Sequence, residues 1–216
     1  NFIYPCLMDG TVSRFYWVVP DKTLDENTKR FLQSHIQEAL KLPSLDPIDN
    51  PNNAFSFSVS NHIVTITTLD ALPGINSGAL LDIDTDFFVF AKALSESHIT
   101  GNMLWDPHEV CSLLKKRVPD PVIVSISASI AGGYLPVAFR FISDGCFEYF
   151  TSGIYPEDAK ELLKTVIAMI SMPIAIPEVL KPKEPVFRPA YEHLEGLTLV
   201  TKGQEDAAIA CIERSA

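Results

Sequence analysis

The stretch Leu81–Asp86, LDIDTD, determines both the fold and the site that we expect for this chain. It continues the apolar run that begins at residue 79, which predicts a buried strand ending in a cluster of carboxylates. In open parallel sheets, ligands bind beyond the carboxyl ends of the strands. Because side chains alternate along an extended chain, we expect Asp82, Asp84 and Asp86 to point to the same side.

Segments of strand type and of helix type alternate along the rest of the sequence. Strands are expected at residues 14–19, 54–59, 62–69, 79–83 and 121–127, and helices at residues 24–40, 107–114, 155–170 and 204–213. Residues 42–54 are expected to form a loop, the proline-rich residues 172–190 an extended segment, and Glu148 part of an edge strand. This alternation predicts an α/β sandwich with a mostly parallel sheet that is covered on both faces.

Composition limits the classes of protein to which this chain can belong. The 216 residues are 47% hydrophobic and 20% charged, which is typical of a globular domain. A net charge of −10 without a basic stripe argues against nucleic acid as a partner. No apolar run reaches the roughly 20 residues that span a bilayer, and the start lacks the layout of a signal peptide. With four scattered cysteines, we expect a cytoplasmic protein without disulfides or a membrane partner.

Three neighbouring carboxylates repel one another unless a positive charge lies among them. Magnesium and manganese prefer hard oxygen ligands, and such ions activate bound water for attack. Asp82, Asp84 and Asp86 are therefore predicted to bind a metal in a hydrolase site. In the alternative interpretation, one of these acids caps a loop and the others face water.

Residues 79–88, together with residues 1–5 and 16–20, resemble an uncharacterised branch of the arginase and deacetylase superfamily. That branch includes peptide arginases, which convert arginine to ornithine within ribosomally made peptides. The resemblance implies a three-layer α/β/α sandwich and two manganese ions, with Asp82 and Asp84 as ligands and Asp86 as an auxiliary group. It further implies that a metal-activated hydroxide attacks the guanidinium carbon of a small-molecule or peptide substrate carrying arginine.

Two family features have no counterpart in this sequence. The first is a D-x-H-x-D cluster on earlier strands, and this absence, with the start at Asn1, leads us to expect part of a longer protein. Residues 1–172 would then be an arginase-like domain lacking its N-terminal strands, and residues 173–216 would pack on it. The second is the glutamate that holds the guanidinium, so the exact substrate stays open. Ser127, Ser129 and Tyr134 are the expected substrate-binding residues.

Two alternative functions stay open at the level of sequence. In a haloacid-dehalogenase-like phosphatase, Asp82 would be the nucleophile, Asp84 the general acid and Ser127 a phosphate ligand. That family also uses a later lysine and a downstream acidic pair, and no downstream strand here ends in paired acids. The other alternative is a degenerate, non-catalytic domain that binds peptides, with residues 173–189 as a docking segment.

Overall fold

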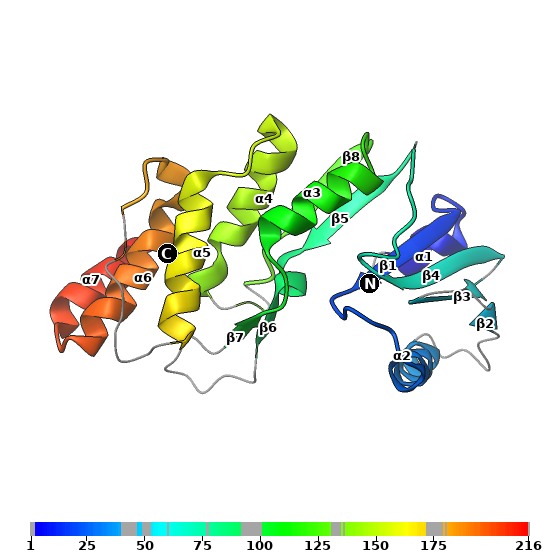
Figure 1. The fold of residues 1–216 in the computed structure, drawn as a ribbon, viewed down its shortest axis with the longest axis horizontal. Coiled ribbons are helices and arrows are strands. Elements are labelled where there is room, and N and C mark those ends of the chain that lie inside the picture. Colours follow the sequence, from blue (N-terminus) through cyan, green and yellow to red (C-terminus); the bar gives the residue numbers. More distant parts are fainter. Residues whose placement is uncertain are drawn as a thin grey trace. The chain divides into compact units, whose positions relative to one another are not determined.

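A computed structural model of the chain describes residues 3–39, 47–48, 53–59, 61–76, 78–91, 101–130, 135, 137–171, 179 and 181–215 (Figure 1). The chain forms two compact units, residues 1–74 and residues 75–216. Helices and small sheets of mixed pairing build both units, so the α/β class expected from the sequence is confirmed. The division expected at residue 172 stays a prediction.

Unit 1 is a four-stranded sheet with two helices. Its strand order is β1-β4-β3-β2, formed by β1 (Arg14–Val19), β4 (His62–Thr68), β3 (Ala54–Val59) and β2 (Pro47–Ile48). β1 pairs with β4 in parallel, whereas β3 pairs with β4 and β2 with β3 in antiparallel fashion. The helices are α1 (Ile3–Met8) and α2 (Glu26–Ala39). The strands expected at residues 14–19, 54–59 and 62–69 and the helix expected at residues 24–40 are confirmed.

One face of this sheet carries the apolar core of unit 1. Alternate residues of the strands, among them Val19, Phe57 and Ile66, are buried together with Leu7 of α1 and Ile36 of α2. Full burial of such a side chain stabilises a fold by about 1.5–3 kcal/mol. The helix α2 begins where Asp25 Oδ1 accepts a hydrogen bond of 2.7 Å from the Thr28 amide. The opposite face of the sheet carries the hydroxyl side chains of Ser56, Thr65 and Thr67.

Two short strand pairs occur in unit 2. β5 (Leu80–Asp84) and β8 (Ile123–Ser127) form a parallel pair, as the sequence predicts for these residues. β6 (Val89–Ala91) and β7 (Gly101–Met103) form an antiparallel pair. The 3-10 helix η1 (Thr85–Phe88) connects β5 directly to β6.

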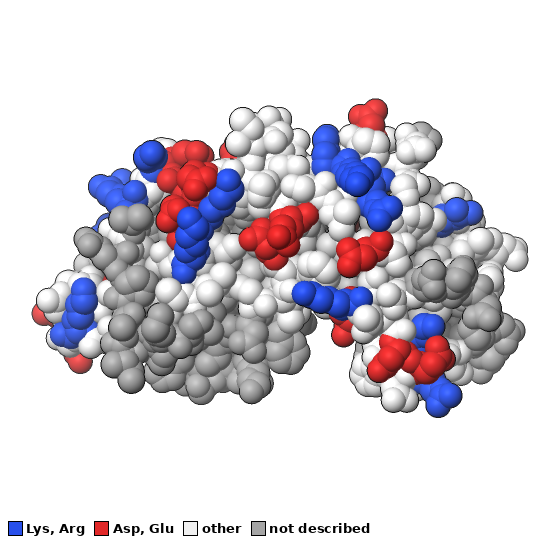
Figure 2. Space-filling model, in the orientation of Figure 1, with Lys and Arg blue, Asp and Glu red and all other residues white. Residues whose placement is uncertain are grey.

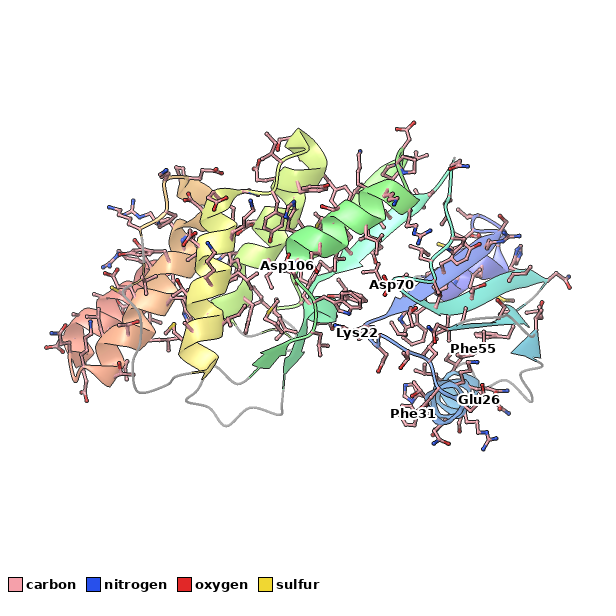
Figure 3. The ribbon with its side chains drawn as sticks, in the orientation of Figure 1. Lys22, Glu26, Phe31, Phe55, Asp70 and Asp106 are labelled. Atoms are coloured by element: carbon pink, nitrogen blue, oxygen red, sulfur yellow. The ribbon has the colours of Figure 1, made fainter. Side chains whose placement is uncertain are left out.

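Helices make up most of unit 2. They are α3 (Pro107–Arg117), α4 (Phe141–Ser152), α5 (Glu157–Ser171), α6 (Arg188–Thr201) and α7 (Glu205–Ser215), with the 3-10 helices η2 (Val137–Phe139) and η3 (Pro185–Phe187). Neighbouring helices from α4 to α7 pack side by side (Figure 1). Asp106, labelled in Figure 3 at the start of α3, accepts hydrogen bonds from the amides of His108 and Glu109, at 2.8 and 3.0 Å. This confirms the expected start of α3 at Pro107.

Three expectations about secondary structure are wrong. Strand β2 lies within the segment expected to be loop. Glu148 belongs to α4 and not to an edge strand. The helix was missed because its apolar residues lie all around it, so the sequence shows no helical period. Pro189 is in the first turn of α6, where its missing N–H costs no hydrogen bond, so the segment expected to be extended already ends at η3.

The helices of unit 2 enclose its core. Its largest fully buried side chains include Phe139, Phe141, Phe187 and Leu194. None of the helices in the described part of the chain combines the length and the apolar character needed to cross a membrane. On the face drawn in Figure 2, acidic and basic side chains are interspersed over the described residues.

Candidate functional site

The strand pair β5–β8 places the predicted acids opposite serines. In the register of the pair, Asp82 faces Ser125 and Asp84 faces Ser127. These four residues are exposed, and they lie on one face of the two-stranded sheet. Parallel strands join their carboxyl ends at one edge, so Asp84 and Ser127 end the two strands side by side.

The strands themselves are less buried than we expected. In β5 only Ile83 is buried, with 5% of its surface exposed, and β8 holds no fully buried residue. The expectation of buried strands is therefore wrong for this pair. The reason is that the pair has two strands in the described part of unit 2, and the face that carries the acids is exposed.

Serine hydroxyls hold both carboxylates. Ser125 Oγ donates a hydrogen bond to Asp82 Oδ1, and Ser129 Oγ donates one to Asp84 Oδ1. A third link joins the same two segments, because Thr85 Oγ1 donates to the Ser127 carbonyl oxygen at 3.0 Å. Each carboxylate is thus fixed by a hydroxyl group of the neighbouring segment. Hydrogen bonds of this kind to a charged acceptor are stronger than those between neutral groups.

Asp86 lies beyond the end of the strand. Thr85–Phe88 form η1, so the extended alternation on which its expected direction rested ends at Asp84. The carboxyl groups nevertheless meet. Partial burial raises the pKa of Asp86, and the charge of Asp84 and a hydrogen bond with its carboxyl group raise that pKa further. The crowding of like charges predicted from the sequence is therefore present between Asp84 and Asp86.

Ser129 adopts a backbone conformation that is rare for its residue type. Its φ angle is 51°, in the left-handed region, and its carbonyl oxygen accepts a hydrogen bond of 3.1 Å from the Leu135 amide. A residue other than glycine in this region costs about 1–3 kcal/mol and persists only where its surroundings hold it. The strained residue is the one whose hydroxyl group holds Asp84.

The structure brings most of the predicted site residues together. Asp82, Asp84, Asp86, Ser127 and Ser129 lie at the carboxyl ends of β5 and β8 or directly after them. Tyr134, the third expected substrate-binding residue, lies outside the described residues. Whether Ser127 and Ser129 bind a substrate stays a prediction, because what the structure shows is their position beside Asp84.

Sequence reasoning missed one residue of this group, Ser125. Its signal was available, because Ser125 is two residues before Ser127 on the same strand and alternation places both on one face. What could not be predicted was the register that sets Ser125 opposite Asp82. The same register makes the group a set of carboxylate and hydroxyl oxygens, the atoms that hard cations prefer.

The described residues alone do not form a complete metal centre. Among them, no group of three or more His, Cys, Asp or Glu side chains is arranged to hold an ion.

The four cysteines are free thiols; Cys111 and Cys146 are buried with their sulfur atoms 3.5 Å apart. The hydrogen bond with Cys111, together with burial, raises the pKa of the Cys146 thiol, which therefore stays protonated.

No family model matches the chain, and neither the curated proteins nor the solved structures include a match. The arrangement of Asp82 and Asp84 against Ser125 and Ser129 is therefore the main basis for a functional proposal.

Proposed function

We propose that this chain carries part of the site of a metal-dependent hydrolase of the ureohydrolase type. Asp82 and Asp84 are the proposed ligands to manganese, and Asp86 supports them. The observation that carries this proposal is the pair of serine-held carboxylates on the open face of two parallel strands, at their carboxyl ends. The resemblance of residues 79–88 to the arginase and deacetylase superfamily supports the reaction class and the three-layer sandwich.

The side chains fit such an ion chemically. Each serine donates to Oδ1, which orients the carboxylate. A metal ion would replace the hydrogen bond that now joins the carboxyl groups of Asp84 and Asp86. A cation would also relieve the repulsion that raises the pKa of Asp86 beside Asp84. When bound, the ions would supply the hydroxide that attacks a guanidinium carbon. The role of Ser125 and Ser129 is to keep the two carboxylates in place for binding.

A site with two ions needs more ligands than the three aspartates provide. The proposal therefore requires further ligands, which correspond to the D-x-H-x-D cluster that the sequence lacks. The substrate proposed is an arginine side chain, free or within a peptide, in a cytoplasmic protein. Within the described residues nothing matches the glutamate that holds a guanidinium in arginases, so we assign substrate selection to Ser127 at the end of β8 and to Ser129 and Tyr134 after it.

Manganese binding to the purified chain tests this proposal directly. We expect Asp84→Asn to weaken the binding of Mn²⁺ at least about tenfold, because it removes one ligand charge. Isothermal titration calorimetry of the wild type and the variant measures the change. Asp120→Asn is the matched control, since Asp120 is exposed on the loop before β8 and lies outside the site. Equal affinity in Asp84→Asn and Asp120→Asn, or no binding by the wild type, would contradict the proposal.

One observation favours the phosphatase as the second candidate. Ser127 ends β8 directly opposite Asp84. In such a phosphatase, a hydroxyl group that binds phosphate would lie at this position, beside the Asp-x-Asp pair of the neighbouring strand. Asp82 would then attack phosphorus and Asp84 would protonate the leaving oxygen. Beryllium fluoride with Mg²⁺ traps such an aspartate as a phosphate analogue, and fluorine NMR detects the adduct.

The two enzyme candidates give different results in these experiments. Manganese binding that depends on Asp84, without a beryllium fluoride adduct, supports the hydrolase. An adduct that Asp82→Asn abolishes supports the phosphatase. Failure of both experiments would favour the third interpretation, a non-catalytic domain that binds peptides, although most of its expected docking segment lies outside the described residues.

A further inference from the structure

The face of the unit 1 sheet opposite its apolar core lines a cavity of about 390 Å³. This volume falls within the range of small-molecule sites, roughly 300–1,000 Å³. Side chains from all four strands and from the turn after β4 line it: Arg14, Tyr16, Ile48, Ala54, Ser56, Ile63, Thr65, Thr67, Ala71 and Pro73. All of the described residues that line the cavity belong to unit 1, and the aspartates of β5 are not among them.

This face differs from an ordinary solvated sheet surface. On a solvated surface, small hydroxyl side chains are exposed to water. Here Thr67 is fully buried and Ser56 is only 4% exposed. The hydroxyl groups of Ser56 and Thr65, which are register partners on β3 and β4, are 2.7 Å apart and hydrogen-bonded. The floor of the cavity is therefore an ordered and recessed polar surface.

Two hydrogen-bond donors converge at one end of the cavity. Arg14 and Tyr16 are two residues apart on β1, so both side chains lie on the same face. Arg14 Nη1 donates to Tyr16 Oη at 3.4 Å. Within the described residues no acceptor is recorded for the hydroxyl hydrogen of Tyr16. A guanidinium and a phenolic O–H side by side form a donor pair that suits a carboxylate.

The charge of the lining selects among anions. Arg14 is the one charged residue in the described lining of the cavity, and Asp70, although next to Ala71 in the sequence, is exposed and is not part of that lining. A single guanidinium balances the single charge of a carboxylate. A phosphate dianion would keep a surplus negative charge in a chain whose net charge is already −10. The apolar side chains Ile48, Ile63 and Pro73 offer contacts to the rest of the ligand.

We propose that this cavity binds a small organic monocarboxylate. Its carboxylate group contacts Arg14 and the Tyr16 hydroxyl, and its apolar body lies against Ile48, Ile63 and Pro73. The hydrogen-bonded pair Ser56 and Thr65 forms the floor beneath the ligand. The site is independent of the metal-dependent activity proposed above.

Benzoate is the probe for the experiment, with benzamide as its neutral match and phenyl phosphate as the dianion. Titrations followed by protein NMR are done on the full chain in the presence of EDTA, so that no metal ion holds the carboxylate. We expect saturable binding of benzoate by the wild type, with affinity at least about tenfold above that for benzamide. Shifted resonances should belong to residues of β1 and β4.

Variants then assign the contact. Arg14→Gln should lower benzoate affinity at least about tenfold and leave the weak binding of benzamide unchanged. Arg30→Gln is the matched control, because Arg30 is an exposed arginine on α2 outside the cavity. Tyr16→Phe should lower the affinity for benzoate by a smaller factor, since it removes one donor and keeps the ring. Unchanged melting temperatures show that each variant folds.

Three results would overturn the proposal. The first is that the wild type shows no saturable binding of benzoate. The second is that Arg14→Gln and Arg30→Gln lose benzoate affinity equally. The third is that phenyl phosphate binds more tightly than benzoate. The last result would assign the cavity to phosphate esters. Because EDTA is present throughout, failure here leaves the manganese experiment on Asp84 unaffected, and failure of that experiment leaves this one unaffected.

Discussion

The two parallel strand pairs β1–β4 and β5–β8 each have one packed and one polar face, but they differ in the elements that surround them. In each pair one face is packed and the other carries polar groups, although parallel strands are usually covered on both faces. The first pair belongs to a four-stranded sheet over an apolar core, whereas the second has two strands beside a layer of helices. The sheet therefore carries the core of unit 1, and the helices carry that of unit 2.

The polar faces of these pairs also differ in charge. On β1–β4, Arg14 and hydroxyl groups surround a cavity, which suits an anion. On β5–β8, Asp82 and Asp84 face serines, which suits a cation. The polar faces of two short parallel pairs thus differ in the charge of the ligand that we propose for each. It also implies that altering the face of β5–β8 disturbs the fold less than altering the sheet of unit 1.

The largest expected effect is in the core of the unit 1 sheet. Ile66 on β4 is fully buried, so Ile66→Ala should lower the free energy of unfolding by about 2–5 kcal/mol. Ile126 on β8 is half-buried, and Ile126→Ala should cost about 1 kcal/mol. Urea denaturation measures both, and hydrogen exchange shows in which unit protection is lost. A cost for Ile126→Ala as large as for Ile66→Ala would break the comparison.

The second effect concerns the helices of unit 2. A Cβ atom added at Gly145 of α4 would lie 2.7 Å from Tyr155 Oη, and Tyr155 is only 3% exposed, so its ring has little room to move. Gly145→Ala should therefore cost about 1–3 kcal/mol, measured by urea denaturation.

The control for this prediction is a glycine with free space around it. Gly74→Ala places a Cβ where no atom lies within 4 Å, so it should be neutral or slightly stabilising. If Gly145→Ala behaves like Gly74→Ala, the tight packing of α4 on Tyr155 does not contribute to the stability of unit 2.

The sequence was sufficient to predict the elements with strong local signals. The strand at residues 14–19 ends at Pro20, and the helix that begins at Pro107 has an Asp cap, so local chemistry determines their bounds. Helix α4 lacks such a signal, because its apolar residues follow no single stripe. Helix α6 has Pro189 in its first turn, close to other prolines in the sequence, and such a cluster is typical of an extended segment. In both cases tertiary packing decides the structure.

The candidate site was predictable to a similar degree. The position of Asp82 and Asp84 at the end of a strand follows from the pattern of apolar and acidic residues. Their partners depend on the pairing of β5 with β8, which brings together residues 43 and 45 positions apart in the sequence. No local pattern encodes such a register. The bend at η1, which ends the alternation before Asp86, likewise results from packing, since Thr85 and Phe88 are buried.

The smallest expected effect on stability is at Ser129. Two variants of this residue separate the effect of backbone strain from the role of the hydroxyl group. With φ at 51°, Ser129→Gly should be about 0.5–1 kcal/mol more stable than Ser129→Ala, because glycine adopts this conformation without strain. Both variants remove the hydroxyl group that holds Asp84, so both should lower manganese affinity by the same factor. Thermal unfolding and calorimetry measure the two quantities.

The pair of Ser129 variants also shows what supports the open face of β5–β8. If manganese affinity falls in Ser129→Ala and not in Ser129→Gly, the backbone conformation orients Asp84 and the hydroxyl group does not. If neither variant changes it, the hydrogen bond to Asp84 has no part in metal binding. Equal losses with unequal stability would mean that the strain at Ser129 is the cost of placing one hydroxyl group beside a ligand.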